Sequence, residues 1–235
     1  MYDDPEVVEH EVRIDRFDVP WFTRAGCGKE SRLYAENHNE TCLVSAEIQT
    51  ENGSFRKFTS FIDNQAFLDY YKVCNEKCIP PNTPCLLFTD HDQLGNVSDL
   101  RKHNEGVKEV SEVLFSLLGI PQQDPVVLTS HRVKEIGDYV STHLRFPTVS
   151  LESCNQTMKA IHHLLKHSGR EYDGLDFGTH ACYQQLRVPG CSKAGSNAKL
   201  LPADGSPLEE ILLASNSGER QYHITTDMAL KCTAC

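Results

Sequence analysis

The chain has 235 residues, of which 39% are hydrophobic and 24% charged, so it is long enough to bury a core and has the composition of a globular protein. It shows neither a run of about 18 apolar residues nor a signal-peptide pattern, so we expect no membrane partner and an intracellular rather than a secreted protein. The formal net charge of -10 argues against a basic nucleic-acid coat protein, and any nucleic-acid surface must therefore be local.

The first predicted elements are two strands and a helix. Residues 41–50 and 55–61 show strand-like alternation on either side of the turn sequence Glu51-Asn52-Gly53-Ser54. Asp63 or Asn64 can cap a helix that has aromatic residues on one face, namely Phe67, Tyr70 and Tyr71. The proline-rich segment 80–84 ends that helix.

Further along, apolar runs at 85–88 and 126–128 predict buried strands, and helical spacing over 97–118 predicts a long helix that ends at Gly119. Residues 139–146 alternate as a strand. The remaining predictions are a helix that includes 158–165, strands at 184–188 and 198–201, and a short helix at 208–214. Strands interleaved with helices predict an α+β fold, or an α/β fold of two lobes.

A pair of carboxylates follows the first apolar run. Asp90 and Asp92 are two residues apart, so on a strand they lie on the same side, and we expect them to be wet at the strand end. Two such charges are costly unless a cation neutralises them, and hard oxygen ligands suit Mg²⁺ or Mn²⁺. The alternative is a solvated turn, because Asp-x-Asp is common by chance.

Two further motifs carry polar chemistry. Ser141 and His143 share the polar face of the 139–146 strand with Arg145, where they could bind phosphate oxygens, although an edge strand with a polar outer face explains the same pattern. Asp176 could add a third metal ligand, and Arg187 and Lys193 downstream suit phosphate contacts. The alternative for Asp176 is a glycine-flanked surface loop.

In this order, the motifs resemble those of the archaeo-eukaryotic primase superfamily, in particular its primase–polymerase branch and viral primase–helicase N-terminal domains. The resemblance covers about residues 42–202 and includes the upstream segments 53–58, 67–71 and 79–80. The matching motifs are Cys85-Leu86-Leu87-Phe88-Thr89-Asp90-His91-Asp92, Val140-Ser141-Thr142-His143-Leu144, Leu175-Asp176, Leu186-Arg187 and Ser192-Lys193-Ala194-Gly195.

The resemblance implies a single catalytic domain built from two modules. A smaller N-terminal α/β module would span about 30–83, an RRM-like catalytic module about 84–205, and a tail 206–235. It implies a DNA-directed primase or polymerase that uses nucleoside triphosphates on a single-stranded DNA template, with a replicative helicase or single-strand-binding protein as a partner. Two Mg²⁺ or Mn²⁺ ions would be bound by Asp90, Asp92 and Asp176, and the nucleotide by Arg56, Ser141, His143, Arg187 and Lys193.

The sequence departs from the family pattern at several positions. The pair is Asp-x-Asp where many members have Asp-x-Glu, Tyr139 stands where a lysine is common, and His180 stands where a tyrosine is common. Cys232 and Cys235 have the spacing of half a zinc site, so the tail could be the start of a truncated zinc module. No second pair follows, and we do not expect this chain to bind zinc. A second candidate metal site is the cysteine cluster Cys74, Cys78 and Cys85. Because Cys85 begins a predicted buried strand, it fits the hydrophobic core better than a metal site.

Two other functions compete with the polymerase. An RRM-like sheet, or an inactive family member, could bind single-stranded nucleic acid without catalysing a reaction. A sheet of that kind usually presents aromatic side chains to the nucleic acid, whereas this sequence predicts Asp, Ser and His there. A metal-dependent nicking enzyme needs His-x-His on a strand. The adjacent His162 and His163 fall in a predicted helix, so they fit that function poorly.

Overall fold

The computed structural model divides the chain into two compact units, unit 1 (Met1–Cys78) and unit 2 (Ile79–Cys235). The residues that it describes are 12–14, 19–23, 27–51, 53–63, 65–67, 76–79, 82–95, 100–134, 137–169, 174–176, 178, 184–193, 196–208 and 220–233. Helices and mainly antiparallel strands occur in both units, and the predicted α+β class is therefore confirmed.

Unit 1 is an antiparallel sheet covered by one helix. The strands lie in the order β1 (Val12–Ile14), β2 (Pro20–Phe22), β4 (Gly53–Phe61), β3 (Cys42–Thr50) and β5 (Glu76–Ile79). The predicted hairpin is present, and Thr50 pairs with Gly53 at its turn. Helix α1 (Cys27–His38) was not predicted from the sequence.

The core of unit 1 is formed by apolar residues on this sheet and on α1. Trp21, Val44 and Phe61 are buried, and Lys57 places its Nζ 3.8 Å from the centre of the Trp21 ring. Asp63 caps a short helical turn at 65–67 by accepting the amide of Ala66 at 2.8 Å. Tyr70 and Tyr71 of the predicted helix lie outside the described residues.

Unit 2 is a sheet built around the 15-residue strand β8 (Gly137–Leu151). Strand β6 (Cys85–Gly95) pairs antiparallel along one edge of β8, from Asp138 to Leu151. Strands β7 (Val126–Lys134) and β11 (Tyr222–Ile224) pair along the other edge of β8, antiparallel at 137–145 and parallel at 149–151 respectively, and β10 (Leu201–Pro202) pairs with β7. A short strand β9 (Gln184–Arg187) belongs to the same unit.

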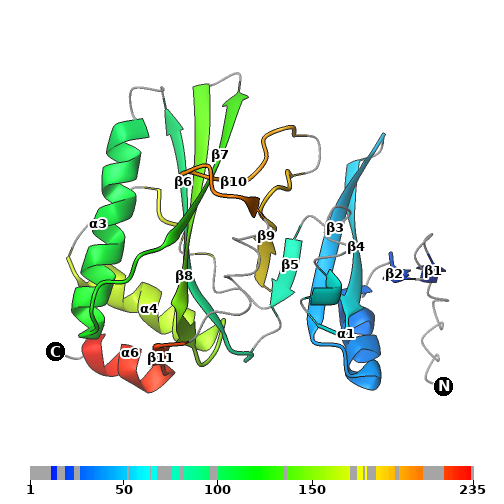
Figure 1. Cartoon of the computed structure of the whole chain (residues 1–235), viewed down its shortest axis with the longest axis horizontal. Coiled ribbons are helices and arrows are strands. Elements are labelled where there is room, and N and C mark those ends of the chain that lie inside the picture. Colours follow the sequence, from blue (N-terminus) through cyan, green and yellow to red (C-terminus); the bar gives the residue numbers. More distant parts are fainter. Residues whose placement is uncertain are drawn as a thin grey trace, which may run out of the picture. The chain divides into compact units, whose positions relative to one another are not determined.

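Three helices cover one face of this sheet (Figure 1). They are α3 (Leu100–Leu118), α4 (Gln156–His167) and α6 (Thr226–Thr233). The core between the helices and the sheet includes the Phe115 and Phe146 rings, which meet edge to face with centroids 5.0 Å apart. Gly119 ends α3 as predicted, with a φ of 66° that suits glycine.

Several predicted boundaries were wrong. Strand β6 extends to Gly95, so Asp90 and Asp92 lie inside a strand and not in the wet turn after it, because a second segment pairs along the other edge of β6. The strand expected at 198–201 is reduced to β10 and a single bridge at Lys199. Residues 220–233, which lie within the predicted tail 206–235, contribute β11 and α6 to the core of unit 2.

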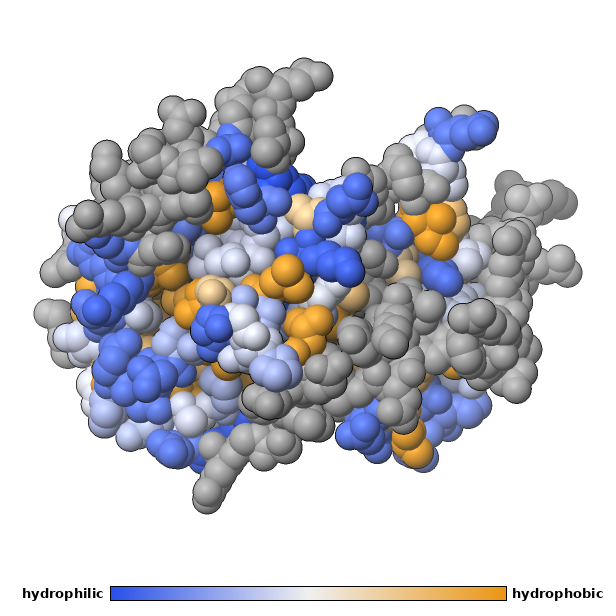
Figure 2. All heavy atoms as spheres, turned by 45° about the horizontal axis from the view of Figure 1, so that its top comes forward, coloured by the Kyte–Doolittle hydropathy of each residue, from blue (hydrophilic) through white to orange (hydrophobic). Residues whose placement is uncertain are grey.

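The surface has the usual mixture of side chains. Figure 2 shows hydrophobic side chains in small groups among hydrophilic ones on the face that it draws. Within the described ranges, no helix is long and apolar enough to cross a membrane.

Candidate functional site

The pairing of β6 with β8 brings two of the sequence motifs together. Asp90 lies opposite His143, and Asp92 lies opposite Ser141. Residues directly opposite each other in an antiparallel pair project to the same face, so these four side chains share one face of the sheet. The intervening residues project to the other face, where Thr142 meets His103 of α3, with Oγ1 and Nε2 2.9 Å apart. The four polar side chains therefore lie on the face that the helices leave open.

Asp176 joins this face through a segment that pairs with the other edge of β6. The amide of Asp92 donates to the Gly174 carbonyl at 2.7 Å, and the amide of Asp176 donates to the Asp90 carbonyl at 2.8 Å. Leu175 forms an antiparallel bridge with His91. Asp176 is thereby held beside Asp90, although its carboxylate is exposed and its Oδ1 accepts the amide of Gly178 at 2.7 Å.

The Asp90 carboxyl is the electrostatic centre of the site. Its side chain is only 19% exposed. Burial, followed by the charges of Asp92 and Asp176, raises its pKa to about 7, and Lys193 and Arg187 act in the opposite direction. The Oδ1 atoms of Asp90 and Asp92 are buried, and neither has a hydrogen-bond partner among the described residues.

His143 is neutral in this environment. Burial, with the positive charges of Arg145, Arg187 and Lys193, holds its pKa well below the ordinary value. Its Nε2 lies 3.3 Å from the Ser141 hydroxyl and 3.4 Å from Asp90 Oδ1. Because the imidazole is uncharged, the latter is a close polar approach and not an ion pair.

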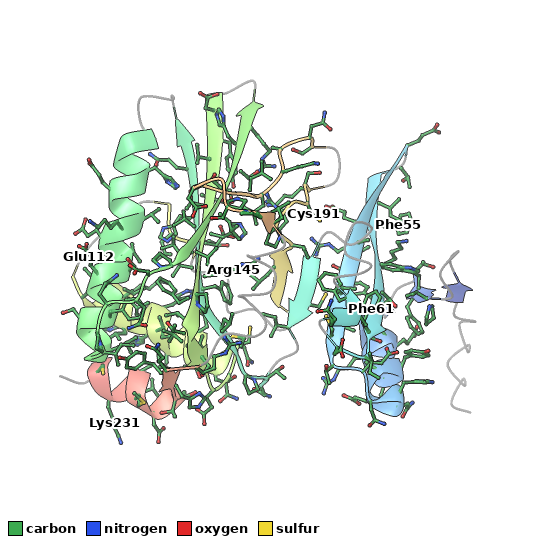
Figure 3. The ribbon with its side chains drawn as sticks, in the orientation of Figure 1. Phe55, Phe61, Glu112, Arg145, Cys191 and Lys231 are labelled. Carbon is green, nitrogen blue, oxygen red and sulfur yellow. The ribbon has the colours of Figure 1, made fainter. Side chains whose placement is uncertain are left out.

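Basic side chains border the carboxylates. Arg145 on β8, labelled in Figure 3, is half-buried. Its Nη2 donates to the backbone carbonyl of Arg187 on β9 at 2.6 Å. Burial lowers the pKa of Arg145 to about 10, and Asp90 partly offsets this. Arg187 is buried and Lys193 exposed. The alternation of β8 placed Arg145 on this face, but its contact with β9 could not be read from the sequence.

Tyr139, which replaces a lysine common in the resembling family, contacts Asp92. Burial, followed by a hydrogen bond between the Tyr139 hydroxyl and Asp92, raises the pKa of Tyr139. The Arg132 guanidinium lies 4.4 Å from the centre of the Tyr139 ring. Tyr139 thus connects a basic residue of β7 to one carboxylate of the site.

Other predicted site residues are not part of this group. Arg56 is exposed on β4 of unit 1. Cys232 lies on α6, partly buried against the hydrophobic core of unit 2, while Cys235, Cys74 and His180 lie outside the described residues. His162 is buried on α4 and its neighbour His163 is exposed, so these two histidines do not share a site.

A divalent ion of the kind implied by the family resemblance fits part of this site. The buried, unpartnered Oδ1 atoms of Asp90 and Asp92 are hard donors that suit Mg²⁺ or Mn²⁺. Asp176 is adjacent, but its Oδ1 is engaged by Gly178. Within the part of the chain that the structure describes, no three His, Cys, Asp or Glu side chains are gathered closely enough to hold a metal as they stand.

Comparison with known proteins gave no match, either to a protein-family model or to a curated protein.

Proposed function

We propose that the chain is a metal-dependent primase or polymerase, a nucleotidyltransferase that makes or extends primers on a single-stranded DNA template. The archaeo-eukaryotic primase fold would be built with unit 2 as its RRM-like catalytic module. The observation that carries the proposal is the position of Asp90, Asp92 and Asp176 on two adjoining segments of one sheet face, beside Ser141 and His143. Asp92 and Ser141 are 49 residues apart in the sequence, and His143 and Asp176 are 33 apart. The fold gathers them on one sheet face, which supports a common role.

In this proposal the three aspartates hold two Mg²⁺ or Mn²⁺ ions. When bound, the ions supply charge neutralisation at the attacking and leaving oxygens of phosphoryl transfer. The buried Oδ1 atoms of Asp90 and Asp92 support this assignment, because unpaired buried carboxylate oxygens are costly without a cation.

The neighbouring residues would bind the incoming nucleoside triphosphate. Neutral His143 can donate one N–H to a phosphate oxygen without adding charge, and the Ser141 hydroxyl can do the same. Arg187 and Lys193 supply positive charge on the same side, since both act on Asp90. Arg56, exposed on β4, is assigned to the nucleotide by the family resemblance alone. Catalysis would come mainly from positioning and from fixed charges in a partly buried site.

A non-catalytic protein that binds single-stranded nucleic acid, or an inactive family member, is the second candidate. The exposed Asp176 carboxylate and its contact with Gly178 favour it, because a metal ligand would have to turn away from that amide. A helicase or single-strand-binding protein is the expected partner in either case.

The test is template-directed synthesis with labelled nucleotides, single-stranded DNA and Mg²⁺ or Mn²⁺. Wild type should give product, and Asp90→Asn should reduce it by at least about a hundredfold while keeping the shape of the side chain. Glu112→Gln is the matched control, because Glu112 is an exposed acid on α3 whose carboxylate lies 3.6 Å from the exposed Lys108. Template binding without synthesis by wild type would favour the second candidate. Equal product from Asp90→Asn would refute the site.

A further inference from the structure

Two exposed histidines lie together at the end of α4, away from the carboxylate site. His163 and His167 are four residues apart and therefore occupy the same side of the helix. Their ring centroids are 3.9 Å apart with planes inclined by 35°. Their Nδ1 atoms are 3.0 Å apart, and His167 Nδ1 also lies 2.9 Å from the His163 carbonyl oxygen.

This spacing matches that of two ligands on one metal ion. Imidazole nitrogens bind Zn²⁺ at about 2.0–2.1 Å, so two nitrogens 3.0 Å apart subtend an angle of roughly 90–100° at a shared ion. That angle suits adjacent positions of a square-planar or octahedral ion and is slightly small for a tetrahedral one. A hydrogen bond between the two rings explains the distance as well, with one Nδ1 as the donor and the other as the acceptor.

We propose that His163 and His167 form a bidentate site for a transition-metal ion of the Cu²⁺, Ni²⁺ or Zn²⁺ class. Imidazole suits these ions, whereas Mg²⁺ prefers the oxygen donors found at Asp90 and Asp92. With no third His, Cys, Asp or Glu gathered there among the described residues, water fills the remaining positions. For metal binding, the proton on the donor Nδ1 moves to Nε2 of the same ring or to solvent, so that both Nδ1 lone pairs can bind the ion.

The position on the helix affects the strength of this site. The C-terminal end of a helix carries partial negative charge, which favours a bound cation. The exposed Lys166 in the same turn opposes it. Since both imidazoles are exposed, the ion binds without unfolding or repacking the core.

The experiment is a Cu²⁺ titration of the full chain, followed by calorimetry and by electron paramagnetic resonance. The expected result is one tight equivalent whose spectrum shows two coupled nitrogens. His163→Ala and His167→Ala should each weaken the affinity at least about tenfold, because each removes one arm of the chelate. Thermal unfolding should show that both variants remain folded.

His38→Ala is the matched control. His38 is also an exposed histidine at the end of a helix and stacks on a ring four residues earlier, but that ring is Tyr34, at a centroid distance of 4.0 Å. His38→Ala should therefore keep the wild-type affinity. The titration is repeated in Asp90→Asn, where the tight equivalent should persist. Unchanged affinity in both His163→Ala and His167→Ala, loss of the equivalent in Asp90→Asn, or a spectrum with fewer than two nitrogens would each overturn the proposal.

Discussion

Asp176 is tied to Asp90 by a backbone hydrogen bond, in which the Asp176 amide donates to the Asp90 carbonyl at 2.8 Å. The position of the third carboxylate thus depends on the pairing of residues 174–176 with β6 and not on a free loop. Changes to that pairing should therefore affect the site even when all three aspartates are kept.

Gly174→Ala should displace Asp176. Gly174 has a φ of 81°, and a Cβ there would lie 2.7 Å from the carbonyl oxygen of Asp92, too close for that backbone to remain in place. We expect synthesis to fall about as far as in Asp176→Ala, which would be measured in the same primer-extension assay.

Gly169→Ala controls for backbone strain alone. Gly169 has a similar φ of 74°, but its Cβ would meet nothing within 4 Å. It should lose about 1 kcal/mol of unfolding free energy in urea and keep its synthesis. Equal loss of synthesis in the two glycine variants would contradict the role of the Gly174–Asp92 contact.

Arg145→Met should destabilise unit 2 by about 2–4 kcal/mol in urea unfolding. It removes the hydrogen bond that the half-buried Arg145 side chain donates to the Arg187 carbonyl and leaves that carbonyl without it. Arg220→Met is the control, since Arg220 is exposed and also donates to a backbone carbonyl of β8, that of Pro147. Its cost should stay below about 1 kcal/mol. Similar costs for the two variants would show that burial of Arg145 has no special effect.

Tyr139→Phe should weaken metal binding with little change in stability. The hydroxyl hydrogen-bonds to Asp92, and partners that orient a metal ligand typically affect metal affinity about tenfold or more. We therefore expect the Mn²⁺ concentration for half-maximal synthesis to rise, while the rate at saturating Mn²⁺ recovers. Tyr222→Phe on β11, outside this site, should leave the Mn²⁺ profile unchanged. A loss of rate that Mn²⁺ does not restore would contradict this role.

Acid should destabilise unit 2 through its buried histidines. Burial lowers the pKa of His103, holds that of His143 well below its ordinary value and lowers that of His91 to about 4. The unfolded chain then binds protons that the folded chain does not, so stability is full above the ordinary pKa of 6.5 and falls as the pH drops below it. The raised pKa of Asp90 makes the folded protein more stable as the pH falls, which opposes the effect of the histidines. Asp90 is a single group, whereas three histidines act together to lower the stability.

His103→Gln should lose less unfolding free energy than wild type between pH 7.5 and pH 5, because one of these histidines is removed. Urea unfolding at the two pH values measures the difference. The exposed His223→Gln should keep the wild-type difference. A His103→Gln variant with the full wild-type loss would contradict the assignment.

From the sequence, it was easier to predict which side chains share a face of the sheet than to predict where a strand ends and which strands pair with it. Strict alternation at 139–146 placed Ser141, His143 and Arg145 together, and β8 confirms this because a two-residue period is a local property. The second half of β6 could not be predicted. Its residues, including Asp90 and Asp92, are polar and are held extended only by partners on both edges, which are far away in the sequence. Helix α1 was not predicted because its sequence, CGKESRLYAENH, has few apolar residues at helical spacing.

Strand β11 has a consequence for handling the protein. Residues Tyr222–Ile224 pair with Val149–Leu151, beyond the stretch of β8 that β7 occupies. A shortened protein lacking them would present an open strand edge next to fully buried apolar side chains at Val149 and Leu151. Open edges of this kind recruit strands from other chains. Removal of the last 16 residues, from Arg220 onward, should therefore produce aggregates rather than a smaller monomer.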